Sequence, residues 1–287
     1  MTISHEVSIP ADPKWADDPY STLPMAGPYD VAIGSALITM VEPHPGHEVA
    51  YNRWYEDDHF YSGAMAMPWM FAGRRWVAPR ELQALREPPD SPICQPLSRG
   101  KWISLYWITR DRYEEHTRWT GATNGRLQED GRKFPQRDNM FTAFYEYAGA
   151  TYRDAEGTRD VHALNYPYQG LVVESFNAGG AERRPRLVDW LKKEHLPQRL
   201  ASSPASMALA FTPISTNQER VRSTGNVPGW EGRVVVAWFL ERPPLDCWNE
   251  FFRGRSGAAR EAGFQVELSA PFIPTLPGTN TYVDQLR

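Results

Sequence analysis

Apolar and polar positions along this chain follow the same succession twice. In the first half, apolar or alternating runs predict strands at 35–41, 71–77, 101–109 and 139–149, with helices at 48–61 and 111–129 between them. In the second half they predict strands at 171–175, 208–212, 233–241 and 264–272, with helices at 185–196 and 243–262. The order strand, helix, strand, strand, helix, strand therefore occurs in each half.

The predicted helix at 185–196 has the clearest helical pattern. Pro185 suits a first helical position, and Pro197 predicts that the helix stops before it. Apolar and charged positions fall on different sides of this helix: Leu187, Trp190 and Leu191 against Lys192, Lys193 and Glu194.

Part of this pattern is a repeat at a fixed distance. Trp54, His59 and Pro68 recur 136 positions later as Trp190, His195 and Pro204. The same shift, without a gap, places the strand residues 36–41 on 172–177. Self-similarity at one offset indicates duplicated structural units.

The order of elements predicts the fold class α+β, as two tandem ferredoxin-like βαββαβ repeats that form an intramolecular dimeric α+β barrel. Each four-stranded sheet leaves one face bare, so we expect the two sheets to pack face to face or to join edges into a closed barrel. We expect an extension at 1–30, a first repeat at 31–155 and a second at 166–287. The long loops at 79–100 and 213–232 are expected to cover sites.

Composition narrows the function. With 31 basic and 35 acidic residues and a pI near 6.0, the chain lacks the charge expected for a nucleic-acid partner. No apolar run reaches the roughly 18 residues of a membrane span, and no secretory signal is visible, so we expect a cytoplasmic protein without membrane contact. Cys94 and Cys247 are expected to be reduced thiols. Aromatic residues, at 13%, suit either a core or a pocket for flat ligands.

The stretch "NRWYEDDHFYSGAMAMP" carries the candidate chemistry. On a helix Tyr55 and His59 share a face, whereas Asp58 lies about 100° from His59. A phenol and an imidazole in one pocket can perform acid–base catalysis, and His195 is the matching candidate in the second half. The alternative is structural: Trp54 and Trp190 fill the core, and the histidines cap helix carbonyls.

The residues that follow could line a pocket for a substrate. "MAMPWMF" combines methionines with aromatics, which suits an irregular pocket or simply a core. Arg74 and Arg75 come next, and on a strand one of them points inward, where it needs an acid or a substrate carboxylate. The other candidates for substrate contact are Trp54, Asp58, Tyr61, Met67, Trp69, Phe71 and Trp190.

Cofactor motifs give little support. His44 and His47 lie near His59, but Pro45 and Gly46 break any regular ligand spacing, so we expect no metal. Haem could bind through His59, His195 or His162, although no signature indicates it. Nucleotide-binding and nucleophile-elbow motifs are absent from the sequence.

"NRWYEDDH" and "VDWLKKEHLPQRL" resemble the N-x-W-Y-x-x-x-H-(L/V)-P pattern of EthD-like and related dimeric α+β-barrel proteins. The first copy departs from that pattern at Phe60 and Tyr61, and the second at Val188 and Leu191. The resemblance implies a pocket between each sheet and its covering helices. Relatives on this scaffold include cofactor-free cyclases and decarboxylases, small monooxygenases, haem enzymes and proteins of no assigned role.

We therefore expect a cofactor-independent lyase, cyclase or isomerase that acts on a small aromatic or polyketide-like molecule, as a monomer or homodimer. His59 is the expected acid–base residue, Tyr55 the donor, and Arg74 or Arg75 the anion partner. A non-catalytic binding protein with the same pocket and a haem-dependent enzyme are the alternatives.

Overall fold

The computed structural model describes residues 31–214 and 229–287. The predicted extension at 1–30 and most of the predicted loop at 213–232 lie outside these residues. No helix in the described ranges is long and apolar enough to cross a bilayer.

Each half contains four strands with helices between the first two and the last two. The first half comprises β1 (Ile33–Pro43), α3 (Glu48–Trp54), η2 (Tyr55–His59), η3 (Tyr61–Met65), β2 (Met70–Val77), α4 (Arg80–Gln83), β3 (Trp102–Thr109), α5 (Tyr113–Glu129) and β4 (Arg137–Tyr152). The second half comprises β5 (Gly170–Asn177), α6 (Arg184–Trp190), η6 (Leu191–His195), α7 (Leu196–Leu200), β6 (Ala205–Pro213), β7 (Arg233–Leu240), α9 (Pro244–Phe251), α10 (Ser256–Glu261) and β8 (Gln265–Pro274). Short 3₁₀ turns η4 (Asp160–His162), η5 (Ala181–Arg183), η8 (Trp230–Gly232) and η9 (Val283–Gln285) complete the described elements.

The eight strands form one closed antiparallel barrel in the order β1-β3-β2-β8-β5-β7-β6-β4. Within it, β4-β1-β3-β2 and β8-β5-β7-β6 are the same ferredoxin-like sheet, once from each half. The halves join through β4–β6 at one seam and β2–β8 at the other. The predicted fold class is confirmed, and of the two expected arrangements the joined edges are the one observed.

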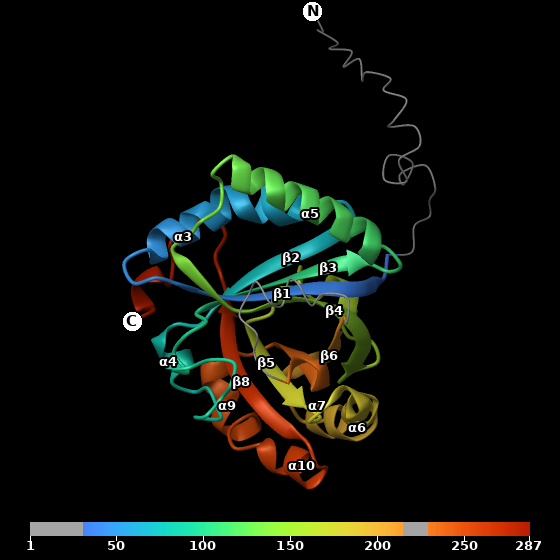
Figure 1. The fold of residues 1–287 in the computed structure, drawn as a ribbon. Coiled ribbons are helices and arrows are strands. Elements are labelled where there is room, and N and C mark those ends of the chain that lie inside the picture. The colour runs from blue at the N-terminus through green and yellow to red at the C-terminus, as the bar shows by residue number, and fades with distance from the viewer. Residues whose placement is uncertain (1–30, 215–228) are drawn as a thin grey trace, which may run out of the picture.

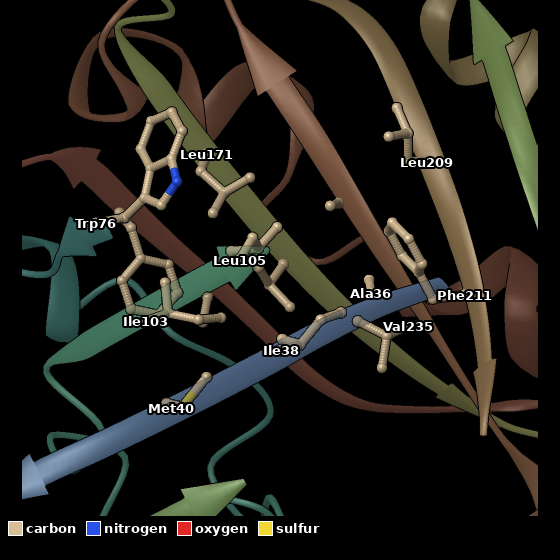
Figure 2. Packing of buried hydrophobic residues seen from close by; sticks show 14 of the residues in the cluster. Ala36, Ile38, Met40, Trp76, Ile103, Leu105, Leu171, Leu209, Phe211 and Val235 are labelled. Carbon is tan, nitrogen blue, oxygen red and sulfur yellow. The ribbon is translucent and has the colours of Figure 1, made fainter. Parts of the chain in front are cut away.

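The barrel interior is the main apolar core. Figure 2 shows side chains from opposite strands pointing toward one another, among them Ile38, Leu105, Leu171 and Phe211, which are all almost fully buried. Alternate residues of each strand face this interior because successive side chains point to opposite faces of a sheet.

The alternation of inward and outward residues shows that the two copies of the repeat cannot be aligned without a gap in their first strands. Ala36, Ile38 and Met40 of β1 face the interior, whereas in β5 the interior residues are Leu171 and Val173. A shift of 136 would place Ala36 on Val172, which faces the helices instead. The strands therefore match only after a one-residue gap, because a slip of one residue turns every side chain to the other face.

Helices cover the outside of the barrel on two opposite sides, with α3 and α5 over the first sheet and α6, α7, α9 and α10 over the second (Figure 1). Beneath the second set lies a core that includes Leu187, Leu191, Trp238, Trp248 and Phe252. The helix-covered face of the second sheet therefore has an apolar core of its own, separate from the barrel interior.

Two helix predictions were wrong. The helix predicted to stop before Pro197 continues through α7, because Pro197 falls in the first turn after a π turn, where its missing N–H is tolerated. The single helix predicted at 243–262 is divided into α9 and α10, and Gly254 between them adopts a left-handed φ of 68°.

Candidate functional site

A five-residue π turn occurs at the same place in both halves, Tyr55–His59 in η2 and Leu191–His195 in η6. Each turn brings a histidine onto the tryptophan five residues before it. Trp54 and His59 are stacked with ring centroids 4.3 Å apart, and Trp190 and His195 lie 4.4 Å apart. In a regular α-helix residues five apart diverge, so the wider π turn is what joins these rings.

Both histidines are packed as neutral rings. Burial, with a contribution from Arg137, lowers the pKa of His59 to about 3, and burial lowers the pKa of His195 to about 4. His59 Nδ1 lies against Gly63 and has no hydrogen-bond partner among the described residues. His195 Nε2 also has no hydrogen-bond partner among the described residues. Neither histidine is poised to exchange protons near neutral pH without a change in its surroundings.

Tyr55 meets His59 edge to face with centroids 5.3 Å apart, as the shared helix face predicted. Its hydroxyl shares a hydrogen bond of 2.5 Å with the hydroxyl of Tyr106 on β3. The guanidinium of Arg75 lies 4.2 Å from the centre of the Tyr55 ring. The structure therefore brings together His59, Tyr55 and Arg75.

Arg75 is the inward arginine of the predicted pair. It is 3% exposed, forms an ion pair with Glu56 and donates to Asn52 Oδ1 over 3.0 Å. Its anionic partner, Glu56, thus belongs to the helical stretch that carries Tyr55 and His59. Arg74 points the other way and donates to the carbonyl oxygens of Leu164 and Tyr166, so it does not join this cluster.

The other predicted residues of the first half have structural contacts. Asp58 pairs with Arg132 and accepts from Ser62 Oγ over 3.0 Å. Met67 and Trp69 are buried in a small cluster beside Tyr106, Phe71 packs against the barrel core, and Tyr61 is 59% exposed. The methionine-rich stretch therefore fills space between helix and sheet.

In the second half, two of the predicted residues reach a cavity. His195 and Trp190 line a hollow of about 560 Å³ between η6 and α10. His195 is 5% exposed, and its ring also contacts Phe176 with centroids 5.6 Å apart. Charged side chains surround this hollow: Arg186, Asp189, Lys193, Glu194 and Glu261.

A second cavity lies on the other side of Phe176, and it contains the chemistry that the sequence predictions missed. It measures about 190 Å³ and is lined by Glu174 of β5, Arg199 of α7 and Phe252, which follows α9. Glu174 is 3% exposed, and both of its oxygens accept from Nη1 of Arg199 at 3.1 and 3.0 Å. A buried ion pair thus forms part of the wall of an open cavity.

Two further donors hold the Glu174 carboxylate. Trp238 Nε1 donates to Oε2 over 2.8 Å, and the hydroxyl of Ser269 lies 3.4 Å from Oε1. Oε1 therefore carries the weaker set of hydrogen bonds and is the oxygen better able to accept a proton. The sequence did contain a signal, because Glu174 is the only charged residue in the strand "GLVVESFN", which is buried throughout.

The first half supplies the far wall of this cavity. Glu87, Pro88 and Pro89 belong to the long loop at 79–100, and they line the cavity of the second half. The backbone of Glu87 exchanges hydrogen bonds of 3.2 and 2.7 Å with Ser269 on β8. Its carboxylate accepts from the backbone N–H of Gly254 over 2.7 Å. The loop therefore lines a cavity of the opposite half, and that it covers a site stays a prediction.

No group of three His, Cys, Asp or Glu side chains among the described residues is placed to hold a metal ion. Of the histidines considered for one, His44 instead lies 3.1 Å from Asp138 through its Nε2.

Some solved structures resemble this chain at low sequence identity. No family model matches this chain, and no curated protein matches it. Among solved structures, an anthrone oxidase-like protein is 10% identical with a TM-score of 0.48, covering 85% of this chain and 92% of its own. A haem complex of a DypB variant from Rhodococcus jostii RHA1 is 11% identical with a TM-score of 0.47, covering 88% and 95%. The assignment to the dimeric α+β barrel fold is made on the strand order.

The residues around His195 do not fit haem. A haem iron held by histidine bonds directly to a ring nitrogen, yet His195 Nε2 exposes less than 1 Å² and the ring lies against Trp190 with centroids 4.4 Å apart. The adjoining hollow carries Asp189, Glu194 and Glu261, whereas pockets for a large flat cofactor are mainly apolar.

Proposed function

We propose that this chain binds a small, flat organic molecule in the smaller cavity and acts on it by acid–base catalysis without a cofactor, as a lyase, cyclase or isomerase. The observation that carries this proposal is the placement of Glu174, a 3% exposed carboxylate, on the wall of a cavity of about 190 Å³. Buried ionisable groups next to a cavity are frequent at catalytic sites.

A purely structural role explains Glu174 less well. The other residues of β5 that face the helices, Val172 and Phe176, are apolar and pack without any ion pair. Replacing a buried ion pair by apolar side chains is often neutral or stabilising, so the pair adds little to folding. Its position beside a hollow favours a function in binding or proton transfer.

Glu174 is the proposed base and Arg199 the proposed stabiliser of negative charge. A proton passes from a C–H or O–H group of the substrate to a carboxylate oxygen of Glu174, and the electron pair stays on the substrate as an enolate or phenolate. Arg199, which touches both carboxylate oxygens, remains beside the negative charge after it has moved. Return of the proton to another atom gives isomerisation, and loss of a leaving group gives a lyase reaction.

The first-half cluster of His59, Tyr55 and Arg75 remains a prediction for a second centre, together with membership of the EthD-like proteins. Contact between Tyr55 and both partners supports it. The Tyr55 hydroxyl already bonds to Tyr106, and Arg75 already pairs with Glu56. We therefore assign the main site to the second half.

Proton abstraction can be tested before the substrate is identified. Acetophenone in D₂O exchanges its methyl protons only through the enolate, and NMR follows the loss of the methyl signal. The wild-type protein should accelerate this exchange, and Glu174→Gln should reduce the acceleration by about 10²-fold or more while ligand binding persists. Glu261→Gln, on the wall of the larger hollow, is the matched control and should exchange at the wild-type rate.

Measurements of binding, exchange and absorbance on the wild-type protein separate the binding-protein and haem alternatives from the proposed enzyme. Wild-type protein that binds one-ring ketones and phenols but accelerates exchange in none of them is a binding protein without this activity. A Soret band in the purified protein would establish the haem alternative and contradict the cofactor-free proposal.

A further inference from the structure

We propose that the smaller cavity takes its ligand in the uncharged form, as a one-ring phenol or enolisable ketone, and that the Glu174–Arg199 pair discriminates against the corresponding anion. The inference uses the site of the proposed function but concerns which ionic form binds there. It depends on charge balance, on the hydrogen bonds of Arg199 and on the shape of the walls.

The cavity lining is balanced in charge at two depths. Inside, the carboxylate of Glu174 is matched by the guanidinium of Arg199, whose side chain is 15% exposed. At the rim, the lining again contains one residue of each sign, Glu87 and Arg255. An anionic ligand would place an uncompensated negative charge beside buried Glu174, which costs free energy through both desolvation and repulsion.

Arg199 is also poorly suited to receive a ligand carboxylate. Its Nη1 donates to both oxygens of Glu174, and its Nη2 donates to the carbonyl oxygen of Phe251 over 2.8 Å. The guanidinium packs against aromatic rings, 4.7 Å from the centre of Trp238 and 5.2 Å from that of Phe252. A bidentate clamp on an external carboxylate needs a free pair of N–H groups, and here the terminal nitrogens are engaged within the chain.

The walls select a flat ring of limited size. Phe176 and Phe252 come from the second half, while Pro88 and Pro89 come from the loop of the first half. The volume of about 190 Å³ lies below the roughly 300 Å³ at which pockets for drug-sized ligands begin. A single aromatic ring with one polar substituent fits these limits.

A neutral acid is also the ligand that this ion pair can deprotonate at least electrostatic cost. Proton transfer from the ligand to Glu174 neutralises the carboxylate and creates the anion of the ligand. The negative charge moves by one hydrogen-bond length and stays next to Arg199. The net charge of the cavity remains zero throughout, so no unpaired charge is buried at any stage.

The test uses 4-nitrophenol, because its neutral and ionised forms absorb at different wavelengths. Wild-type protein should bind the neutral form, so that the bound probe shows the phenol band and its affinity falls at least tenfold as the pH rises through the ionisation of the free phenol. Glu174→Gln leaves Arg199 unmatched, and this variant should bind the yellow phenolate instead. Glu261→Gln, which removes one negative charge from the neighbouring hollow, should behave as wild type.

If Glu174→Gln does not fold, wild-type protein alone can test which ionic form binds. Benzamide should then bind at least tenfold more tightly than benzoate, which has the same ring and a full negative charge. Preference for phenolate or benzoate, or absence of binding by both neutral probes, overturns the inference.

The result is separable from that of the proposed function. Selective binding of neutral probes without deuterium exchange contradicts catalysis and leaves the inference standing. Deuterium exchange in a protein that prefers the anionic probes supports catalysis and contradicts the inference about the ionic form.

Discussion

Arg75 and Glu56 form a buried ion pair in which each charge needs the other as its partner. Their side chains are 2% and 8% exposed, and the pair lies between β2 and the helical stretch above it. Glu56→Gln would leave the guanidinium buried without a charged partner, which typically costs about 3–5 kcal/mol. We expect a loss of this size in the free energy of unfolding, measured by urea denaturation at neutral pH.

The neighbouring residue provides the control for that substitution. Asp57 pairs with Arg53 on the exposed side of the same helix, so Asp57→Asn removes an equal charge in a setting where solvent screens it. Asp57→Asn should lower stability far less than Glu56→Gln. Equal losses of stability in the two variants would show that burial does not increase the contribution of the Arg75–Glu56 pair.

The two stacked histidines predict how stability depends on pH. In the folded protein the pKa of His59 is about 3 and that of His195 about 4, against 6.5 for an unperturbed histidine. The unfolded chain therefore binds protons below pH 6.5 that the folded chain does not. Stability is complete above pH 6.5 and falls as the pH decreases toward 4, with a slope of about 1.4 kcal/mol per pH unit for each histidine.

Urea denaturation between pH 7 and pH 5 measures that slope. His195→Gln should make the decline less steep by the share of one histidine. A slope that is the same in wild type and His195→Gln would mean that His195 has the same pKa in the folded and the unfolded chain.

At the scale of elements, the sequence predicted most helices and strands and failed where a helix departs from its usual period. The spacing of Tyr55 and His59 correctly placed the two rings in contact. It did not predict that Trp54 would stack on His59, because a period of 3.6 residues separates positions five apart. The π turn is a tertiary solution, and the repeated Trp-x-x-x-x-His spacing was its only trace in the sequence.

The π turn in the second half can be removed by shortening it by one residue. Deleting Lys193, whose side chain is 71% exposed, should convert the turn to α-helix and leave Trp190 and His195 four positions apart, on one face of that helix. We expect the pKa of that histidine to stay near 4 because it keeps its buried position beside Trp190, as measured by NMR titration. Lys193→Ala keeps the length of the turn and should also keep the low pKa, whereas a rise toward 6.5 in the deletion variant would contradict this account.

At the scale of the whole molecule, the sequence predicted both sheets but could not choose how they meet. Either packing face to face or joining edges would bury the bare faces, since both remove the same apolar positions from water. The barrel also pairs the edge strands, which otherwise expose unpaired N–H and C=O groups. The site depends on this choice, because only the closed barrel brings the loop at Glu87 from the first half against Ser269 in the second. A sequence read one half at a time could not place residues on both sides of that cavity.

The closed barrel makes the connection between the halves dispensable for holding them together. The seam between β4 and β6 runs from Tyr145↔Pro213 to Tyr152↔Met207, and the seam between β2 and β8 adds the pairs Trp76↔Pro274 and Val77↔Ile273. Both seams are hydrogen-bonded sheet, and the apolar core inside the barrel is shared by both halves. A break in the exposed turn between Ala155 and Glu156 cuts neither seam.

A specific protease site inserted at that turn should therefore yield, after cleavage of the folded protein, two fragments that elute together on size exclusion at neutral pH. In denaturing urea the same fragments should separate, and dilution should restore the complex. The uncut insertion variant controls for the insertion itself. Fragments that separate under native conditions would mean that the covalent connection, rather than the two seams, holds the barrel closed, and the cavity formed between the halves would then open on cleavage.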